Sequence, residues 1–142
     1  MDYNTSGISL REGKAFIDGL EVLDLVKCEI KITPEVWSGK QVGEQTDSTR
    51  WLGYKVTGVI TRRRSTKWLK EITKKYQASR KTPELTIQGI QSDPNSEYYE
   101  NYGSDVTTAV GCVLTGDLSL TALDSKGDIL DDVISFNAKD VV

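Results

Sequence analysis

Few residues in this 142-residue chain could support chemistry, and the first to consider are its two cysteines. Cys28 and Cys112 each lie in an alternating, strand-like run and share a face with Val, Ile or Leu. This setting is typical of small core residues, because free cysteine is among the most frequently buried residue types. The alternative is a redox pair or a metal site, but no CxxC spacing is present and the chain contains no histidine.

The absence of histidine removes the commonest general base near neutral pH and the commonest metal ligand. Four carboxylates near the end of the sequence suggest a calcium loop: Asp124, Asp128, Asp131 and Asp132. Their register does not fit, because an EF-hand places glycine after the third ligand and Gly127 precedes Asp128. There is no glycine-rich nucleotide motif and no nucleophile elbow. We therefore expect no enzyme, no cofactor and no metal.

The composition, 37% apolar and 27% charged, is that of a soluble globular protein. We expect a single domain over residues 1–142, with residues 1–10 as a polar N-terminal arm that needs a partner to become ordered. No apolar run approaches the roughly 18 residues of a membrane helix. The first residues do not resemble a signal peptide, so synthesis in the cytoplasm is expected.

Two long runs, residues 26–33 and 52–61, alternate between apolar and polar side chains and are predicted to be strands buried on one face. A polar segment, residues 38–50, separates them and is much longer than a usual hairpin loop. Trp37 and Trp51 stand at its two ends, and Pro34 is expected at an edge or bulge just before it. A segment this polar has no core of its own, so it is either mobile or ordered by another surface.

An amphipathic helix is predicted over residues 65–79, with Ser65 as its N-cap and Thr82-Pro83 after its end. Its apolar stripe comprises Trp68, Leu69, Ile72 and Tyr76, which we expect to anchor it to the core. The opposite face carries Lys67, Lys70, Lys74 and Lys75.

The remaining elements are strands and turns. A short hairpin turns at Asp18-Gly19, and strands are expected over residues 85–90, 106–114 (continuing through Leu118, Leu120 and Ala122) and 133–138. A polar loop over residues 92–105 holds Tyr98, Tyr99 and Tyr102, which either pack on the domain or form a contact surface. The predicted fold class is mainly β (α+β): an antiparallel β-sandwich or open barrel of seven or eight strands with one amphipathic helix.

Charge is distributed unevenly along the chain. Residues 62–81 carry a net charge of +8, whereas residues 82–142 carry −9. Three interpretations of the basic segment stay open: a solvated or internally paired face, docking onto an acidic protein, or binding of nucleic acid.

The order of these elements resembles the tail tube proteins of contractile phage tails, defective prophages and phage-tail-like bacteriocins, closest to the Gram-positive, defective-prophage type. The similarity begins at SGISLREGKAFIDGLEV and runs through KCEIKI, the long polar loop, WLGYKVTGVITRRR and the helix with its Trp-Leu pair. It ends with LTALDSKGDILDDVISFNA and so covers essentially the whole chain. The resemblance implies a structural, self-assembling virion component whose hexameric rings stack into a hollow tube, with the inner strands joined into a ring barrel.

The resemblance also implies partners and roles for individual residues. Expected partners are other copies of the chain, the tail sheath protein, and the baseplate, tape-measure and terminator proteins, with no membrane and no specific nucleic-acid binding. Candidates for lining the channel are Lys27, Glu29, Lys31, Lys55 and Thr57, and the four helix lysines are candidates for facing the sheath. The expected ring-stacking loop comprises Trp37, Ser38, Gly39, Lys40, Gln41, Val42, Gly43, Glu44, Gln45, Thr46, Asp47, Ser48, Thr49, Arg50 and Trp51.

A second hypothesis comes from a different class of protein. A small β-sandwich that binds carbohydrate or peptide could use the Tyr98–Tyr102 loop as its platform. Such a module would stay monomeric, whereas a tube protein would form rings or long polymers, so the size of the particle distinguishes the two.

Overall fold

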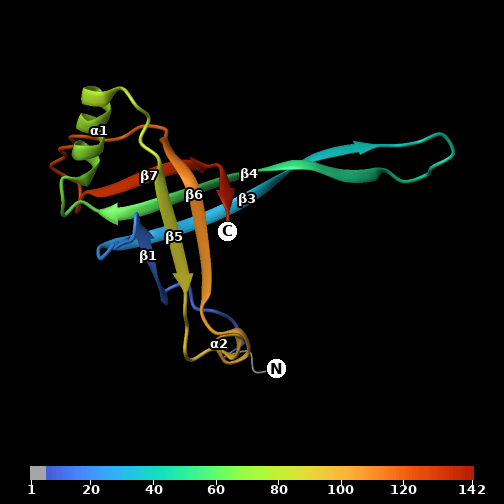
Figure 1. The fold of residues 1–142 in the computed structure, drawn as a ribbon. Helices are drawn as coiled ribbons and strands as arrows, with labels where there is room; N and C mark the ends of the chain where they lie inside the picture. Colours follow the sequence, from blue (N-terminus) through green and yellow to red (C-terminus); the bar gives the residue numbers. More distant parts are fainter. Residues whose placement is uncertain (1–5) are drawn as a thin grey trace.

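The computed structural model describes residues 6–142, which form eight strands and two helices (Figure 1). Residues 1–5 of the expected N-terminal arm lie outside the described part of the chain. The strands are β1 (Gly13–Ile17), β2 (Leu20–Glu21), β3 (Leu25–Gly39), β4 (Ser48–Arg63), β5 (Leu85–Gln91), β6 (Asp105–Thr115), β7 (Asp131–Ala138) and β8 (Asp140–Val141). The helices are α1 (Trp68–Ser79) and α2 (Glu97–Tyr102).

All pairings between the described strands are antiparallel, and the strand order is β2-β1-β5-β6-β7-β4-β3, with β8 also pairing β6. The long strand β6 belongs to two sheet sections. Its first part pairs with β5 and β8 in the section that we call sheet A, which also contains β1 and β2. Its last residues, Val113–Thr115, pair with β7 in the section that we call sheet B, which also contains β4 and β3. In Figure 1, β5 and β6 cross the direction of β3, β4 and β7. The predicted mainly β, antiparallel fold class is confirmed.

The core lies between the two sheet sections. Sheet B contributes Ile60 and Phe136, sheet A contributes Ile87 and Ala109, and Cys112 lies where the sections meet; all five are almost completely inaccessible to solvent. The alternation of β3 and β4 explains the arrangement, because their register pairs Cys28 with Ile60, Ile30 with Gly58 and Ile32 with Val56 on the core side.

The predicted hairpin at Asp18-Gly19 is confirmed. Both residues have positive φ (51° and 82°), which a two-residue hairpin turn of this kind requires. Asp18 also accepts a hydrogen bond from the backbone N–H of Thr86, so the turn is fastened to the start of β5.

Strands β3 and β4 are longer than predicted. They remain paired out to Gly39 and Ser48, so the connecting loop spans only residues 40–47. The expected loop over residues 38–50 is therefore wrong at both ends, because cross-strand pairing alone sustains strands that have no core beneath them. The distal part of this hairpin projects from the body as a two-stranded ribbon (Figure 1), which we call the arm (residues 33–55). Pro34 lies within β3 rather than near its end, one residue before the Glu35/Val36 irregularity.

The predicted start of the helix is wrong. Helix α1 begins at Trp68, and its N-cap position, Lys67, makes no side-chain capping bond. Ser65 instead donates a hydrogen bond to the Asp24 carboxylate, which draws it out of the helix. The helix ends at Ser79, as predicted, where Arg80 adopts the left-handed conformation and its backbone N–H donates a hydrogen bond to the Tyr76 carbonyl.

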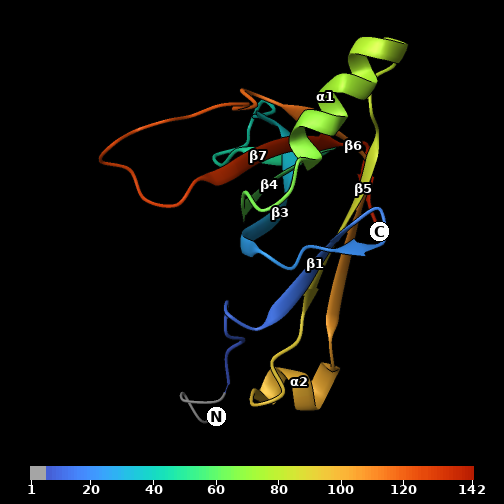
Figure 2. The same cartoon turned by 90° about the vertical axis from the view of Figure 1, so that its left-hand side faces the viewer.

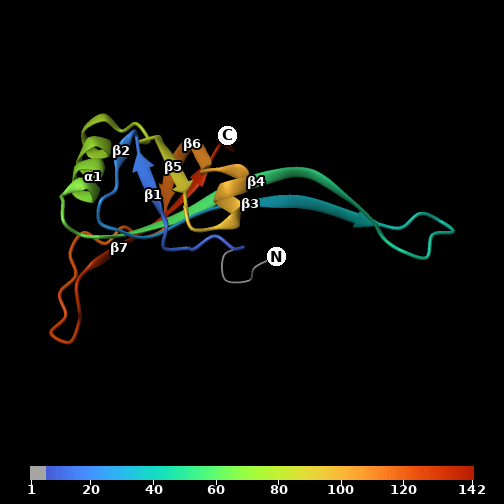
Figure 3. The same cartoon turned by 90° about the horizontal axis from the view of Figure 1, so that it is seen from below.

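Two further segments differ from expectation. The tyrosines lie on α2, a short helix whose N-cap, Ser96, accepts a hydrogen bond from the backbone N–H of Tyr99. The alternation through Leu118, Leu120 and Ala122 does not form a strand, because β6 ends at Thr115. Residues 116–130 form a long loop that projects from sheet B on the side away from sheet A (Figures 2 and 3).

Candidate assembly surfaces

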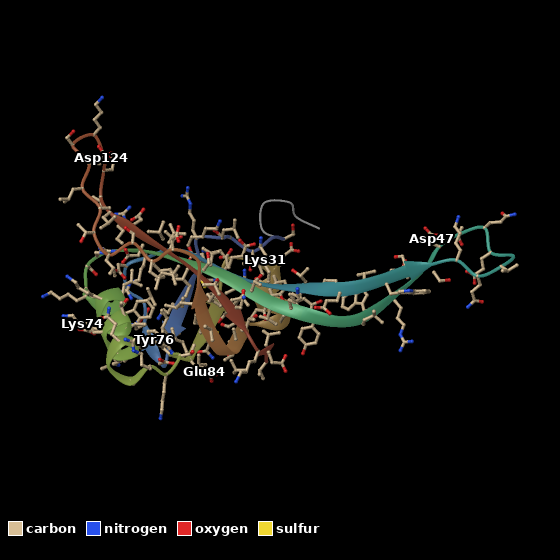
Figure 4. All side chains as sticks on the ribbon, turned by 90° about the horizontal axis from the view of Figure 1, so that it is seen from above. Lys31, Asp47, Lys74, Tyr76, Glu84 and Asp124 are labelled. Atoms are coloured by element: carbon tan, nitrogen blue, oxygen red, sulfur yellow. The ribbon has the colours of Figure 1, made fainter. Side chains whose placement is uncertain are left out.

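Sheet B presents a polar face on its side away from the core. The register aligns Lys27, Glu29 and Lys31 of β3 with Thr61, Val59 and Thr57 of β4 and with Val133, Ser135 and Asn137 of β7, so the face is mostly polar with two valines. Figure 4 shows Lys31 on this side of the sheet and Tyr76 and Glu84 on the other. Four of the five sequence candidates for a channel lining therefore lie together on one continuous sheet surface.

Charges on this face compensate one another. Glu29 forms ion pairs with the two nearest lysines of β3, with Nζ–Oε distances of 3.9 Å to Lys27 and 3.3 Å to Lys31. Lys55, the fifth candidate, lies where the arm begins and pairs with Glu35 across the two strands at 3.9 Å. The pairs are exposed, so each contributes about 0–1 kcal/mol to stability. Their main effect is a polar surface with little net charge.

Sheet B has an unpaired strand edge on each side within residues 6–142. Strand β3 pairs only with β4, so the outer edge of its 15 residues has no partner. On the opposite side, β5 covers β6 only as far as Cys112, which leaves the outer edge of Val113–Thr115 without a strand. Unpaired edges present free backbone N–H and C=O groups that can pair with another strand, and the edge of β3 is long enough to act as a template. Their position follows from strand order, which sequence reasoning did not predict.

The arm exposes apolar side chains on both faces. Strand pairing places Val36 beside Trp51 on one face and Trp37 beside Arg50 on the other. Trp51 is 65% exposed and Trp37 is 49% exposed. An indole left in water loses most of the stabilisation that its burial would give, which is about 1.5–3 kcal/mol for a large apolar side chain. The arm therefore has the surface of a docking element.

The tip of the arm is ordered by its own contacts. Glu44 accepts hydrogen bonds from the backbone N–H of Gln41 and from the Ser48 hydroxyl, at 3.2 Å each. Lys40 pairs with Asp47 at 3.9 Å. A partner is thus not needed to give residues 40–47 a defined turn.

Helix α1 covers one end of the core through Leu69 and Ile72, which are buried, and through Trp68, which packs against the core and lies 5.9 Å from the Arg62 guanidinium. Tyr76 is 43% exposed, so its expected role as a core anchor is corrected. The anchoring contacts come from the first half of the helix.

The helix lysines Lys67, Lys70, Lys74 and Lys75 are all exposed. Figure 4 shows Lys74 directed away from the body. None of the four forms an ion pair with any residue among 6–142, so pairing with the acidic second half of the same chain receives no support.

Two arginines that precede the helix are engaged within the domain. Arg62 binds the Asp24 carboxylate at 3.0 Å. Burial alone would raise the pKa of Asp24, but the hydrogen bond from Ser65 and the charge of Arg62 outweigh it and hold that pKa below its usual value. Arg64 binds the buried Asp132 at 2.6 Å.

Arg64 also fixes the base of the loop over residues 116–130. Its guanidinium donates hydrogen bonds to the backbone carbonyls of Ser119 and Leu120. The sequence suggested only a basic run, and no spacing pattern distinguishes this arginine from its neighbours.

The described residues contain no cluster of three or more His, Cys, Asp or Glu side chains that could hold a metal ion. Cys28 and Cys112 are free thiols, and burial raises the pKa of both. On α2, at the far end of sheet A from α1, the Tyr98 and Tyr102 rings are in tilted contact with their centroids 5.0 Å apart. No helix within residues 6–142 has the length and apolar character needed to span a membrane.

The described residues thus form a mainly antiparallel β domain with unpaired strand edges, a projecting arm and a sheet face on which charges compensate one another. The chain belongs to the phage tail tube family, because the family model described as "Phage tail tube protein" matches residues 4–141. No curated protein sequence matches the chain.

The fold is also similar to solved structures of contractile injection systems. One is a chain from "the anti-feeding prophage (AFP) baseplate", with a TM-score of 0.68, 12% identity and coverage of 100% of this chain and 96% of that one. A chain from the "PVC sheath-tube complex in extended state" gives a TM-score of 0.70 at 10% identity, with 96% and 90% covered. A chain from the "PVC sheath/tube terminator in extended state" gives 0.71 at 10% identity, with 96% and 95% covered.

Proposed function

We propose that this chain builds the inner tube of a contractile tail or tail-like particle, and that its hexameric rings stack to enclose a channel. The observation that carries the proposal is the pair of unpaired edges on sheet B: the outer edge of β3 and the outer edge of Val113–Thr115. Membership of the tail tube family and the similarity to a chain of a sheath-tube complex support it.

The strand directions favour closure by these edges. Sheet B contributes four strands in the order β6-β7-β4-β3, each antiparallel to the next. When neighbouring copies are related by rotation about the ring axis, β3 of one copy lies beside β6 of the next. Because sheet B has an even number of strands, β3 and β6 run in opposite directions, so this junction is antiparallel as well. A ring closed in this way removes both unpaired edges. The polar face would then line the channel, with the apolar core behind it.

An oxidation experiment tests the junction. Val113 lies on the polar face of β6, so in the proposed junction it pairs with a residue on the polar face of the neighbour's β3, where we test Lys27, Glu29 and Lys31. We expect Val113→Cys combined with cysteine at one of these three positions to give a ladder of cross-linked copies that ends at the hexamer, since paired strands bring Cα atoms within disulfide reach. Single-cysteine variants control for the native thiols Cys28 and Cys112.

Electron microscopy of the purified chain supplies the decisive outcome. Rings or long hollow particles are expected, and a chain that remains monomeric at all concentrations would refute the proposal. Tubes that form without any cross-linked ladder would place the junction at other strands.

The arm is proposed to connect successive rings. Replacing residues 41–46 with a two-residue Asn-Gly turn should leave the domain folded, because the tip contacts only itself. Rings should persist while tubes are lost. Normal tubes from the shortened chain would exclude the tip from stacking.

The lysine face of α1 is proposed to meet the sheath. Exposed pairs contribute about 1 kcal/mol or less each and are screened by salt, so many weak contacts could align a sheath and still let it slide. Reversing Lys70, Lys74 and Lys75 to glutamate should leave bare tubes intact and abolish decoration by co-expressed sheath protein. Decoration that survives the reversal would leave these lysines as a solvated face.

A further inference from the structure

The arm carries an aromatic and a cation side by side. Trp37 and Arg50 are direct cross-strand partners, so their side chains emerge on the same face about 5 Å apart at Cβ. The Trp37 ring lies over Gly39, where a Cβ would come within 2.7 Å of it, so the glycine makes room for the indole. The Arg50 side chain is exposed and forms no ion pair or hydrogen bond with any residue from 6 to 142.

The opposite end of the molecule holds a cleft whose lining is part apolar and part charged. It has a volume of about 280 Å³ and lies between the β1–β2 hairpin and the start of α1. Its apolar lining comes from Ile17, Leu20, Val22 and Trp68. Leu20 is 76% exposed, which is costly for a leucine in an isolated domain. Figure 3 shows this end, marked by β2 and α1, at the left and the arm at the right.

The charges around the cleft complement the arm. Arg62 lines the cleft but is already bound by Asp24. The remaining charged lining residues are Glu21, Glu71 and Lys67, all exposed and without an ion pair among the described residues, so the cleft has an excess of one negative charge. A single arginine delivered beside an indole would neutralise it.

We propose that this cleft receives Trp37 of a second copy of the chain, with Arg50 of that copy against Glu21 and Glu71. The inference rests on the proposed function, since it names the surface that the arm meets when rings stack. The arm and the cleft lie at opposite ends of one molecule. A contact between two different surfaces leaves one of each free at the ends of the assembly, so when the copies are related by translation further copies add without forming a closed ring. That repetition generates a filament, as stacking requires.

Charge exchange tests the contact directly. Arg50→Glu should raise the critical concentration for tube formation more than tenfold, because the change recurs in every subunit of each ring interface. Adding Glu21→Arg or Glu71→Arg to that variant should bring the concentration back towards that of the unmodified chain. Arg11→Glu, an exposed reversal in the segment before β1, is the matched control and should have no effect.

A photo-cross-linker at position 37 provides a second measurement. In assembled tubes, benzoylphenylalanine in place of Trp37 should link to peptides that contain residues 17–22 or 62–71. If the unmodified chain forms tubes, cross-links to other segments or the failure of both rescue variants would overturn the assignment of the cleft as the site that receives Trp37. Absence of tubes from the unmodified chain would instead refute the proposed function and this inference with it.

Discussion

Gly58 provides a sharp test of how sheet B is packed. A Cβ built on Gly58 would lie 2.4 Å from Cζ of Phe136 and 2.5 Å from the carbonyl oxygen of Glu29. Both distances are shorter than real Cβ atoms show, and one of the two atoms belongs to the backbone of the neighbouring strand. Phe136 is 1% exposed, so its ring is enclosed by other core residues. Alanine at position 58 must therefore displace the ring, the strand or both.

The magnitude follows from the two opposing terms. Overpacking of a dense core typically costs about 1–3 kcal/mol. Replacing glycine by alanine at an unstrained position gains about 0.4–1 kcal/mol through the unfolded state. Because a backbone atom is in the way, we take the upper part of the first range and expect Gly58→Ala to lower the free energy of unfolding by about 2 kcal/mol.

The same strand offers a matched control. A Cβ on Gly53 would meet only the end of the Glu35 side chain, at 3.5 Å, which is ordinary contact. Gly53→Ala should therefore be neutral or slightly stabilising. In urea unfolding of the monomeric chain followed by tryptophan fluorescence, Gly58→Ala should move the midpoint down by roughly 1 M, given a slope of about 1–3 kcal/mol per M. Equal midpoints for the two variants would refute the packing argument.

Three further outcomes are expected, each measured by the same unfolding assay. Trp68→Ala should lower the free energy of unfolding by about 2–3 kcal/mol, less than for a fully buried tryptophan, because Trp68 is partly buried against the core. Tyr76→Ala should lower it by under about 1 kcal/mol because this side chain is exposed. Equal losses for the two variants would contradict the helix packing. Arg64→Met should lower the free energy of unfolding by about 2–4 kcal/mol because it leaves the buried Asp132 carboxylate without its partner. Arg63→Met, which breaks an exposed pair, should lower it by under about 0.5 kcal/mol, and similar losses for the two variants would disprove the special role of Arg64. The pKa of Asp24 is lower in the folded chain, so its stabilising contribution is present above its unfolded pKa of about 3.9 and is lost as pH falls through the folded value; a pH profile that Asp24→Asn leaves unchanged below pH 4 would contradict this.

Much of the fold could be predicted because it depends on local patterns. Alternation gave the body of β3 and β4 and the face that each residue occupies, and Asp18-Gly19 gave the first hairpin turn. The misplaced boundaries arise where a non-local contact decides the outcome. Pairing between β3 and β4 extends these two strands as far as Gly39 and Ser48. The hydrogen bond from Ser65 to Asp24 removes the expected helix cap.

The assembly surfaces divide in the same way. The polar face and the lysine face follow from periodicity, so the sequence identifies their members. The unpaired edges depend on strand order, and the cleft depends on how β2 approaches α1, and neither leaves a local signature. The Trp37–Arg50 pair became visible only once the register of the arm was known.

The even number of strands in sheet B has a consequence for the size of the channel. In the proposed ring every junction between copies would be antiparallel whatever the number of copies, so the same backbone hydrogen bonds could close a ring of five, six or seven. Copy number would then be set by curvature, that is, by the twist and coiling between neighbouring strands. Residues that fix how closely the strands approach would control this curvature, and Gly58, which packs under Phe136, is one of them. The bore of the tube would thus be encoded in the core of the subunit and not in the residues that face the channel.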